Sequence, residues 1–264
     1  MNNNSEKTIN VGGSVELALS GKYPLTMKSV VKEAWHHTMK NFVSFSPAIV
    51  VLLIVQIAIL YIALQMQLGD PWQVLAMISD QEQALTALNA ISIANFSYEA
   101  ISAPIYVGVC MMAVSHAVGI ASRTGHILRG LQYTLPVIMV TLASLILQWV
   151  AGIFVPIVPL YLTLAFTFAP LLICEKRLSP WQALWLSLRA VNKKLFVLVA
   201  IHVLLMLMFI VAIAFYGIGL IVVLPFFFHV KGVLYRQMFG VQLKVIDKSA
   251  LEKGQHHSSP FFDA

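Results

Sequence analysis

Charged residues are scarce in this sequence, since Asp, Glu, Lys and Arg together make up 11% of its 264 residues. Soluble domains carry about 25% charged residues. Hydrophobic residues account for 59%, so too few charges remain to solvate a globular surface of this size. The scarcity excludes an ordinary soluble domain. The formal charge of +6 does not indicate nucleic-acid binding either, because the basic residues are split into clusters at the ends of apolar runs.

Motifs for catalysis and for metal binding are also missing. The chain has no Walker loop, no glycine pattern of dinucleotide-binding folds, no HExxH and no CxxC. Its two cysteines, Cys110 and Cys174, lie inside apolar runs, which excludes a disulfide framework and suits packing. We therefore expect a protein without enzymatic activity, without a cofactor and without a bound metal.

Acidic residues are missing from the middle of the apolar runs, where proton-coupled transporters often carry one. Glu99 and Glu175 stand at the ends of such runs. We expect them at opposite faces of a membrane, paired with nearby polar groups. Lys231 lies within the last run, and we expect its long side chain to reach the cytoplasmic phosphate level.

Six long apolar runs dominate what is present, and each is long enough to cross a hydrocarbon core of ~30 Å as a helix. The predicted spans are 48–68, 99–121, 135–155, 157–174, 195–216 and 220–239. They predict an all-α, polytopic six-helix transmembrane bundle over residues 25–240. We expect residues 1–24 to be a flexible cytoplasmic tail, residues 241–264 to be a cytoplasmic tail and 69–98 to be the longest connection. Residues 113–121 carry small residues at four-residue spacing, which predicts that the second span is central and buried.

Lys and Arg residues follow a one-sided pattern. All seventeen lie before the first predicted span, in residues 122–134, in residues 175–194 or from Lys231 onward, so none falls in an outer connection. Because connections rich in Lys and Arg stay in the cytoplasm, this pattern places both termini there and requires an even number of spans. We expect a multi-pass protein of the bacterial inner (plasma) membrane.

Two amphipathic segments lie on the predicted cytoplasmic side. In residues 175–194, Ser179 is a predicted N-cap and Gln182 completes a capping box. A second segment, 26–45, is expected to end at Pro47. Such interfacial helices lie in the membrane surface, with aromatic residues in lipid and charges in water. The predicted lipid-interface residues are Lys28, Lys32, Trp35, Lys40, Trp181, Trp185, Arg189 and Lys193.

The stretch LLICEKRLSPWQALWLSLRAVNKKLF, and the last span with its internal proline, LPFFFHVKGVLYRQMFG, resemble a family of bacterial inner-membrane proteins. These are related to the membrane domain of glycerophosphodiester phosphodiesterases and include YciC-like proteins. The shared elements are a Ser-Pro-x-x-Ala-Leu-x-x-Ser helix, here Ser179 to Ser187, and the Leu-Tyr-Arg ending after Pro225. The resemblance implies a six-helix membrane domain. Because nothing in these 264 residues suits the soluble catalytic barrel, the phosphodiesterase activity is not carried over.

Three histidines lie inside predicted spans: His116, His202 and His229. Their positions place all three in the cytoplasmic half of the membrane, on three different helices. Ionisable side chains within spans usually face the bundle interior, so we expect at least two to meet in an inward-facing polar pocket. Such a pocket suits proton-responsive gating or weak metal binding; alternatively, each imidazole bonds a carbonyl or hydroxyl on a neighbouring helix. Pro104 and Pro225 are the predicted helix breaks.

Two functions remain open from the sequence. The first is a non-enzymatic inner-membrane protein that scaffolds or senses the cytoplasmic leaflet through its basic amphipathic helices. Its partner would be the phospholipid bilayer, and anionic lipids in particular. The second is a small transporter or permease subunit with an inward-facing polar pocket. Either protein suits a homo-oligomer or a dedicated protein partner, and neither involves nucleic acid.

Overall fold

The computed structural model describes residues 7–245. Within that range, six helical segments are long and apolar enough to cross a membrane: Met27–Leu68, Ala84–Ala117, Thr124–Phe154, Val158–Lys176, Leu195–Ala214 and Leu220–Phe239. Each overlaps one predicted span. Helices are the expected solution, because a helix satisfies its backbone hydrogen bonds internally where lipid offers none. The chain is an all-α bundle of the multi-pass membrane type, as the apolar runs predicted.

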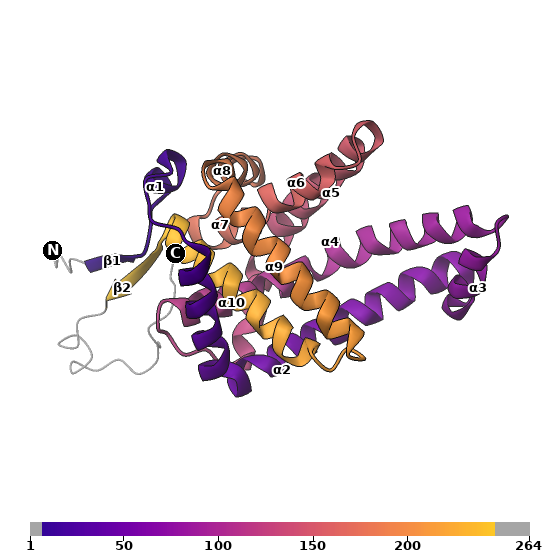
Figure 1. The fold of residues 1–264 in the computed structure, drawn as a ribbon, viewed down its shortest axis with the longest axis horizontal. Helices are drawn as coiled ribbons and strands as arrows, with labels where there is room; N and C mark the ends of the chain where they lie inside the picture. The colour runs from indigo at the N-terminus through magenta and orange to yellow at the C-terminus, as the bar shows by residue number, and fades with distance from the viewer. Residues whose placement is uncertain (1–6, 246–264) are drawn as a thin grey trace.

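In chain order the elements are β1 (Lys7–Val11), α1 (Val15–Ser20), α2 (Met27–Leu68), η1 (Pro71–Gln73), α3 (Val74–Ser79), α4 (Ala84–Ala117), η2 (Thr124–Tyr133), α5 (Thr134–Phe154), α6 (Val158–Ala165), α7 (Ala169–Lys176), α8 (Pro180–Lys193), α9 (Leu195–Ala214), α10 (Leu220–Phe239) and β2 (Val241–Val245). Figure 1 shows two hairpins projecting from a common body: α2 with α4, and α5 with α6. The strands β1 and β2 lie at the end opposite these hairpins.

α2 is one helix of 42 residues, from Met27 to Leu68, and Pro47 lies inside it. We expected two separate helices here, 26–45 and 48–68, and that prediction is wrong because the backbone stays helical across the proline. Figure 1 shows instead that α2 bends between its first part, beside the body, and its second part, which runs out alongside α4. Proline removes one intrahelical hydrogen bond and kinks a helix without always ending it.

α4 begins at Ala84, well before the second predicted span, 99–121. Glu99 therefore lies inside a helix of 34 residues and not at its outer end, as we expected. The predicted outer connection, 69–98, shrinks to η1 and α3 at the tip of the α2–α4 hairpin. A charged residue interrupts an apolar run in the sequence, but the helix continues where that charge faces a polar space inside the protein.

α4 and α10 form the centre of the bundle. In the most apolar stretch of α4, 78% of the residues are buried inside the protein, compared with 22% in that of α9, whose other side chains are left to contact lipid. Small residues let the two central helices approach closely. A side chain at Gly232 of α10 would collide with the backbone of Ala113 on α4. These contacts confirm the prediction that the second span is central and buried.

η2 packs against α4 through two glycines. A Cβ atom added to Gly130 of η2 would collide with the carbonyl oxygen of Pro104, and one added to Gly108 of α4 would collide with the carbonyl oxygen of Ile127. The segment 122–134 is therefore held against the core over much of its length. Pro104 itself stays inside α4, so the helix break predicted there is wrong.

The fourth span is interrupted. α6 ends at Ala165 and α7 begins at Ala169, with a turn between them. Backbone polar groups at such a break need partners within the protein. Ser187 of α8 supplies one, because its hydroxyl donates to the carbonyl oxygen of Ala165 at 2.6 Å. α10, by contrast, continues through Pro225, so the break predicted there is wrong and the interruption lies at 166–168.

The two ends of the described chain pair as a sheet. β1 and β2 run antiparallel, with Lys7 opposite Val245 and Val11 opposite Val241. β2 follows α10 after a single residue, Gly240, which ends the helix with a positive φ of 64°. Sequence patterns over five residues do not reveal such a pairing between segments more than 200 positions apart.

The stretch between β1 and α2 also packs against the body. Ser14 caps α1 with its side chain, and Ala18 of α1 is fully buried. We predicted a flexible tail at 1–24, and this is wrong for β1 and α1, which strand pairing and burial fix in place. β2 lies at the start of the predicted tail 241–264. The first six residues and residues 246–264 lie outside the described range.

Candidate functional site

α8 is the helix predicted around the capping box. The Ser179 hydroxyl accepts from the backbone N–H of Gln182 at 3.5 Å, and the Gln182 side-chain oxygen accepts from the backbone N–H of Ser179 at 3.3 Å. The buried face of α8 consists of Ala183, Leu184, Ser187, Ala190 and Val191. Trp181 and Trp185 remain 68% and 56% exposed. The helix is thus separate from the span before it, seated on protein along one face and open on another.

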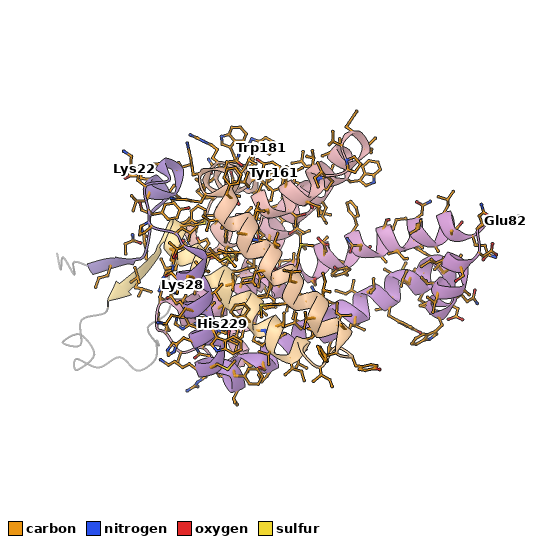
Figure 2. All side chains as sticks on the ribbon, in the orientation of Figure 1. Lys22, Lys28, Glu82, Tyr161, Trp181 and His229 are labelled. Atoms are coloured by element: carbon orange, nitrogen blue, oxygen red, sulfur yellow. The ribbon has the colours of Figure 1, made fainter. Side chains whose placement is uncertain are left out.

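The predicted lipid-interface residues are exposed. They are Lys28, Lys32, Trp35 and Lys40 on α2 and Trp181, Trp185, Arg189 and Lys193 on α8. Figure 2 places Lys22 and Lys28 at one end of the molecule and Glu82 at the opposite tip. Lys193 packs beside Gly21, at the same end as Lys22. Basic side chains therefore gather at the end that carries β1 and β2.

His116 of α4 and His229 of α10 form a polar cluster at the centre of the bundle. His116 Nδ1 lies 3.0 Å from His229 Nε2, and the two rings stack with 5.2 Å between their centroids. The residues are only 2% and 1% exposed, so they form a packed cluster and not an open pocket. Phe45 of α2 closes one side, with its ring centroid 4.6 Å from that of His229.

The hydrogen bonds around this pair fix its neutral tautomers. The carbonyl oxygen of Pro225 can only accept, so His229 donates to it from Nδ1 at 2.8 Å. His229 Nε2 is then the acceptor and His116 Nδ1 the donor. His116 Nε2 in turn accepts from the Ser122 hydroxyl at 2.7 Å. The hydrogen bonds therefore run in one direction, from Ser122 to Pro225, and every ring nitrogen has a partner.

The third histidine lies apart from this cluster. His202 donates from Nδ1 to the carbonyl oxygen of Leu198, on its own helix, at 2.9 Å. Thr38 of α2 takes the place beside the pair, with its hydroxyl oxygen 3.3 Å from His229 Nδ1. The prediction that at least two of three histidines converge is confirmed for His116 and His229. His202 instead bonds a backbone carbonyl, within its own helix and not across to a neighbour.

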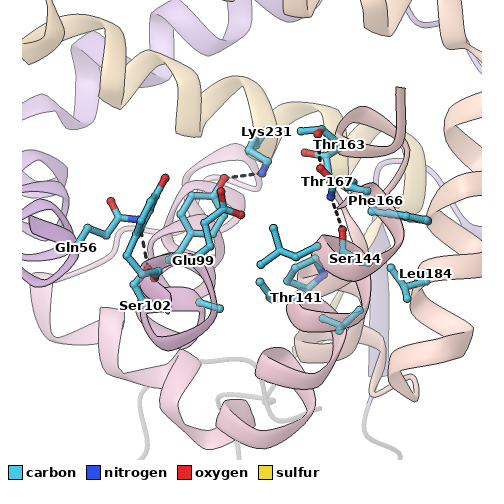
Figure 3. A pocket seen from close by; sticks show the side chains of 18 residues that line it. Gln56, Glu99, Ser102, Thr141, Ser144, Thr163, Phe166, Thr167, Leu184 and Lys231 are labelled. Carbon is cyan, nitrogen blue, oxygen red and sulfur yellow. Dashed lines mark hydrogen bonds between the residues drawn. The ribbon is translucent and has the colours of Figure 1, made fainter. Parts of the chain in front are cut away.

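A cavity of about 340 Å³ lies between α2, α4, α5, α10 and the interrupted fourth span. Its polar lining consists of Gln56, Tyr98, Glu99, Ser102, Tyr106, Thr141, Ser144, Gln148, Thr163, Thr167 and Lys231. Figure 3 shows Gln56 and Ser102 on one side of this space and Thr141 and Ser144 on the other. Because lipid offers no hydrogen bonds, so many polar side chains around one space indicate a site for water or for a polar ligand.

Lys231 faces this cavity from α10. The residue is 7% exposed, and its Nζ donates to the Tyr106 hydroxyl oxygen at 2.7 Å. The rings of Tyr106 and Phe227 have centroids 4.9 and 5.5 Å from the ammonium, within cation–π range. The predicted reach of Lys231 to the phosphate level is wrong, because neighbouring helices enclose it. Among the described residues Tyr106 is its single hydrogen-bond acceptor, which leaves two N–H donors for water or a ligand.

Glu99 faces the same cavity from α4. Its Oε1 accepts from the Asn95 side chain, one turn earlier, at 3.1 Å. α4 extends past Glu99 on both sides, so the helix does not begin there, and the membrane-face position of Glu99 stays a prediction. Glu175 pairs with polar groups, as predicted. Its Oε2 lies 3.1 Å from Lys176 Nζ and accepts from the Tyr235 hydroxyl at 2.7 Å.

Short hydrogen bonds order the remaining polar wall. Thr163 donates to the side-chain oxygen of Gln148 at 2.7 Å, and Gln148 donates from Nε2 to the Ser144 hydroxyl at 2.8 Å. On the opposite side, Gln56 donates to the Ser102 hydroxyl at 3.3 Å. The cavity therefore offers one ammonium, one carboxylate and a set of fixed amide and hydroxyl dipoles. Such a lining suits a charged or strongly polar molecule.

One feature of the sequence, Lys231, indicates this cavity, although we predicted a different position for its side chain. Lys231 lies near the middle of the last predicted span, and an intramembrane ionisable residue marks a functional site by default. The other residues that line the cavity come from six other helices and the turn at 166–168, so no local motif identifies them.

Comparisons of the chain with protein-family models, with curated proteins and with solved structures find no match. Within residues 7–245, no group of three or more His, Cys, Asp or Glu side chains is placed to hold a metal ion. The function has to be argued from the two polar sites themselves.

Proposed function

We propose that this chain binds a small ligand carrying charge in the polar cavity and moves it within or across the membrane, as a transporter or permease subunit. The observation that carries the proposal is that Lys231 and Glu99 line one cavity inside an apolar bundle. An ionisable side chain at the centre of a membrane helix costs about 2.5–3.5 kcal/mol on insertion scales. A fold that encloses Lys231 at such a cost, with Glu99 on the wall of the same cavity, uses the charges for binding, and no catalytic role is proposed.

The interrupted fourth span supports a transport role. Phe166 and Thr167, in the turn between α6 and α7, both line the cavity. Non-helical backbone at membrane depth occurs where it lines a cavity, and many transporters place broken helices at the substrate site. The turn gives this span a point about which its two halves can move separately.

We also propose that the protein resides in the bacterial inner membrane with β1 and β2 on the cytoplasmic side. Support comes from the basic side chains, which gather at the end that carries the two strands. The tip around Glu82 has acidic but no basic residues, as expected of a periplasmic segment.

The family resemblance stays part of this proposal. The residues that carry it have structural roles: Ser187 bonds the backbone at the interruption at 2.6 Å, and Tyr235 donates to Glu175 at 2.7 Å. Such roles favour a shared six-helix architecture with the YciC-like proteins and assign no activity.

Thiol labelling tests whether the cavity admits charged solutes. In a chain with Cys110 and Cys174 replaced by alanine, Ser144→Cys places a thiol in the cavity wall and Leu142→Cys places one on the exposed, lipid-facing side of α5. We expect a charged methanethiosulfonate reagent to modify Ser144→Cys in the reconstituted full-length protein. Leu142→Cys should stay unmodified, because a thiol in hydrocarbon does not ionise. Two equally inert thiols would contradict an accessible cavity.

A second function, scaffolding or sensing of the cytoplasmic leaflet, is favoured by the exposed basic residues of α2 and α8. Each Lys or Arg near an anionic surface contributes about 1 kcal/mol. Changing Lys28, Lys32, Lys40, Arg189 and Lys193 to glutamine should lower the anionic lipid that co-purifies with the full-length protein in mild detergent. Unchanged lipid retention would remove this second function and leave the first in place.

A further inference from the structure

An apolar groove of about 140 Å³ runs between α5 and α8. Its walls are Leu147, Phe166, Trp181, Leu184, Trp185 and Leu188. The two tryptophans are more than half exposed, so the groove opens toward the surface that α8 presents outside the bundle. A groove with only apolar and aromatic walls on a membrane protein fits a hydrocarbon chain.

The groove and the polar cavity share two walls, Phe166 and Leu184. Figure 3 shows these two side chains close together at one side of the cavity, across from Gln56 and Ser102. A single layer of side chains therefore separates the two spaces. Phe166 belongs to the turn between α6 and α7, and Leu184 belongs to α8, so this layer is formed by side chains of two different elements.

We infer that the ligand is a zwitterionic phospholipid, with its phosphate and amine in the polar cavity and one acyl chain leaving through the α5–α8 groove. The inference rests on the proposed function and names the ligand of that same site. When Phe166 and Leu184 part, the groove gives the chain an apolar path from the headgroup to the surrounding lipid. Phe166 and Leu184 are then the gate that the chain has to part.

The charges of the cavity select the headgroup. Lys231 has two N–H donors beyond its bond to Tyr106, and these suit a phosphate. Glu99 supplies a carboxylate for an amine on the same ligand. A ligand with one charge of each sign complements both groups, whereas an anion alone would offer no positive charge to the part-buried Glu99.

The size of the cavity suits a headgroup and excludes a whole lipid. Since a water molecule takes about 30 Å³ in the liquid, 340 Å³ holds on the order of ten waters, or a headgroup of similar atom count. The hydrocarbon chain then has to lie outside the polar space, and the groove is the neighbouring apolar one.

Binding to the full-length chain in nanodiscs of phosphatidylglycerol tests the inference, because that lipid carries no amine. The probes are tritiated lysophosphatidylethanolamine, which has the headgroup and one chain, and tritiated glycerophosphoethanolamine, which has the headgroup alone. Empty nanodiscs give the background. Leu147→Trp and, independently, Leu188→Trp fill the groove without lining the polar cavity. Ile146→Trp, exposed on the same helix, is the matched control.

We expect the wild type and Ile146→Trp to bind both probes. The groove-filling variants should lose at least tenfold in affinity for the lysophospholipid and bind glycerophosphoethanolamine unchanged. Lys231→Met should lose both probes. That pattern identifies a headgroup site with a chain exit, and it separates a lipid ligand from a free phosphate ester.

Two other results would overturn the inference at different levels. If both groove-filling variants bind the lysophospholipid as Ile146→Trp does, the chain does not use the groove, and the cavity remains a site for a soluble ligand. If Lys231→Met retains both probes, or if the wild type binds neither, the cavity does not recognise this headgroup. The labelling of Ser144→Cys then decides whether the proposed function also fails.

Discussion

Arg236 and Glu33 form a two-point ion pair between α10 and α2. Arg236 Nη2 donates to Glu33 Oε2 at 2.8 Å, and Nη1 lies 2.6 Å from Oε1. Nη1 also donates to the carbonyl oxygen of Ala117, the last residue of α4, at 2.8 Å. One guanidinium therefore ties three helices together at a single point.

Arg236→Lys should destabilise the protein although it keeps the charge. Lysine lacks the planar guanidinium that bonds the Glu33 carboxylate and the Ala117 carbonyl oxygen together. Hydrogen bonds to charged groups contribute about 1.5–3 kcal/mol each. We expect a lower Tm in thermal unfolding of the detergent-solubilised protein. Arg189→Lys, on the exposed side of α8, is the control and should leave Tm unchanged.

The two central histidines should act as one unit. His116→Ala removes the donor to His229 Nε2, so His229→Ala added to it should cost less than it does in the wild type. We expect a coupling energy of about 0.5–3 kcal/mol in a double-mutant cycle on thermal unfolding. His202→Ala should add independently to His116→Ala, because it bonds its own helix. Additive effects for the His116 and His229 pair would contradict the cluster.

Gly130→Ala should be far more damaging than Gly125→Ala, although both lie in η2. The added methyl group would meet the carbonyl oxygen of Pro104 at position 130, whereas nothing lies within 4 Å at position 125. Overpacking typically costs 1–3 kcal/mol, about what a loss of several degrees in Tm reports. Equal Tm values for the two variants would show that η2 and α4 are not in close backbone contact at Gly130.

Stability should fall at high pH because of Tyr23. Its hydroxyl is buried without a hydrogen-bond partner among the described residues, and burial raises the pKa of Tyr23 from 10.0 to about 12. Between these values the unfolded phenol loses its proton while the folded one keeps it, so the free energy of unfolding declines as pH rises. Tyr23→Phe should unfold with less dependence on pH between 10 and 12. Tyr216→Phe, at a residue 98% exposed, should behave as the wild type.

Labelling at the tip of the α2–α4 hairpin tests the orientation. Ser79, at the end of α3, is exposed. With the native cysteines replaced, Ser79→Cys should react with a membrane-impermeant thiol reagent added to the periplasmic side of intact cells. Reaction only after the cytoplasmic side is opened would reverse the proposed topology.

The architecture could be predicted because its causes are local. Apolar runs long enough to cross a bilayer mark the helices, and Ser179 with Gln182 marks the start of α8, since a capping box needs only neighbouring residues. The convergence of His116 and His229 was predicted because both lie in the same half of the membrane, where ionisable side chains usually face the bundle interior. Depth is readable along a helix, but its rotation is not, and for that reason His202 could not be separated from the other two.

The polar cavity could not be predicted, because its parts are distant in sequence. A hydropathy pattern does not say that Lys231 and Glu99, on α10 and α4, turn toward the same space. The turn at 166–168 itself contains no proline or glycine, since its sequence is Phe-Thr-Phe, and the nearby Pro170, in the first turn of α7, did not distinguish a break from a continuous helix. Its cause is tertiary: Ser187 of α8 bonds the carbonyl that the break exposes.

The antiparallel pairing of β1 with β2 also has a temporal consequence. Domains form during synthesis from the N-terminal end, but the partner of Lys7–Val11 is Val241–Val245, which leaves the ribosome after all six membrane-crossing helices. The first strand has to wait, unpaired, while all six membrane-crossing helices are inserted. Pairing of β1 with β2 is therefore a late folding event. A molecule in which this sheet has formed has already synthesised its whole membrane domain.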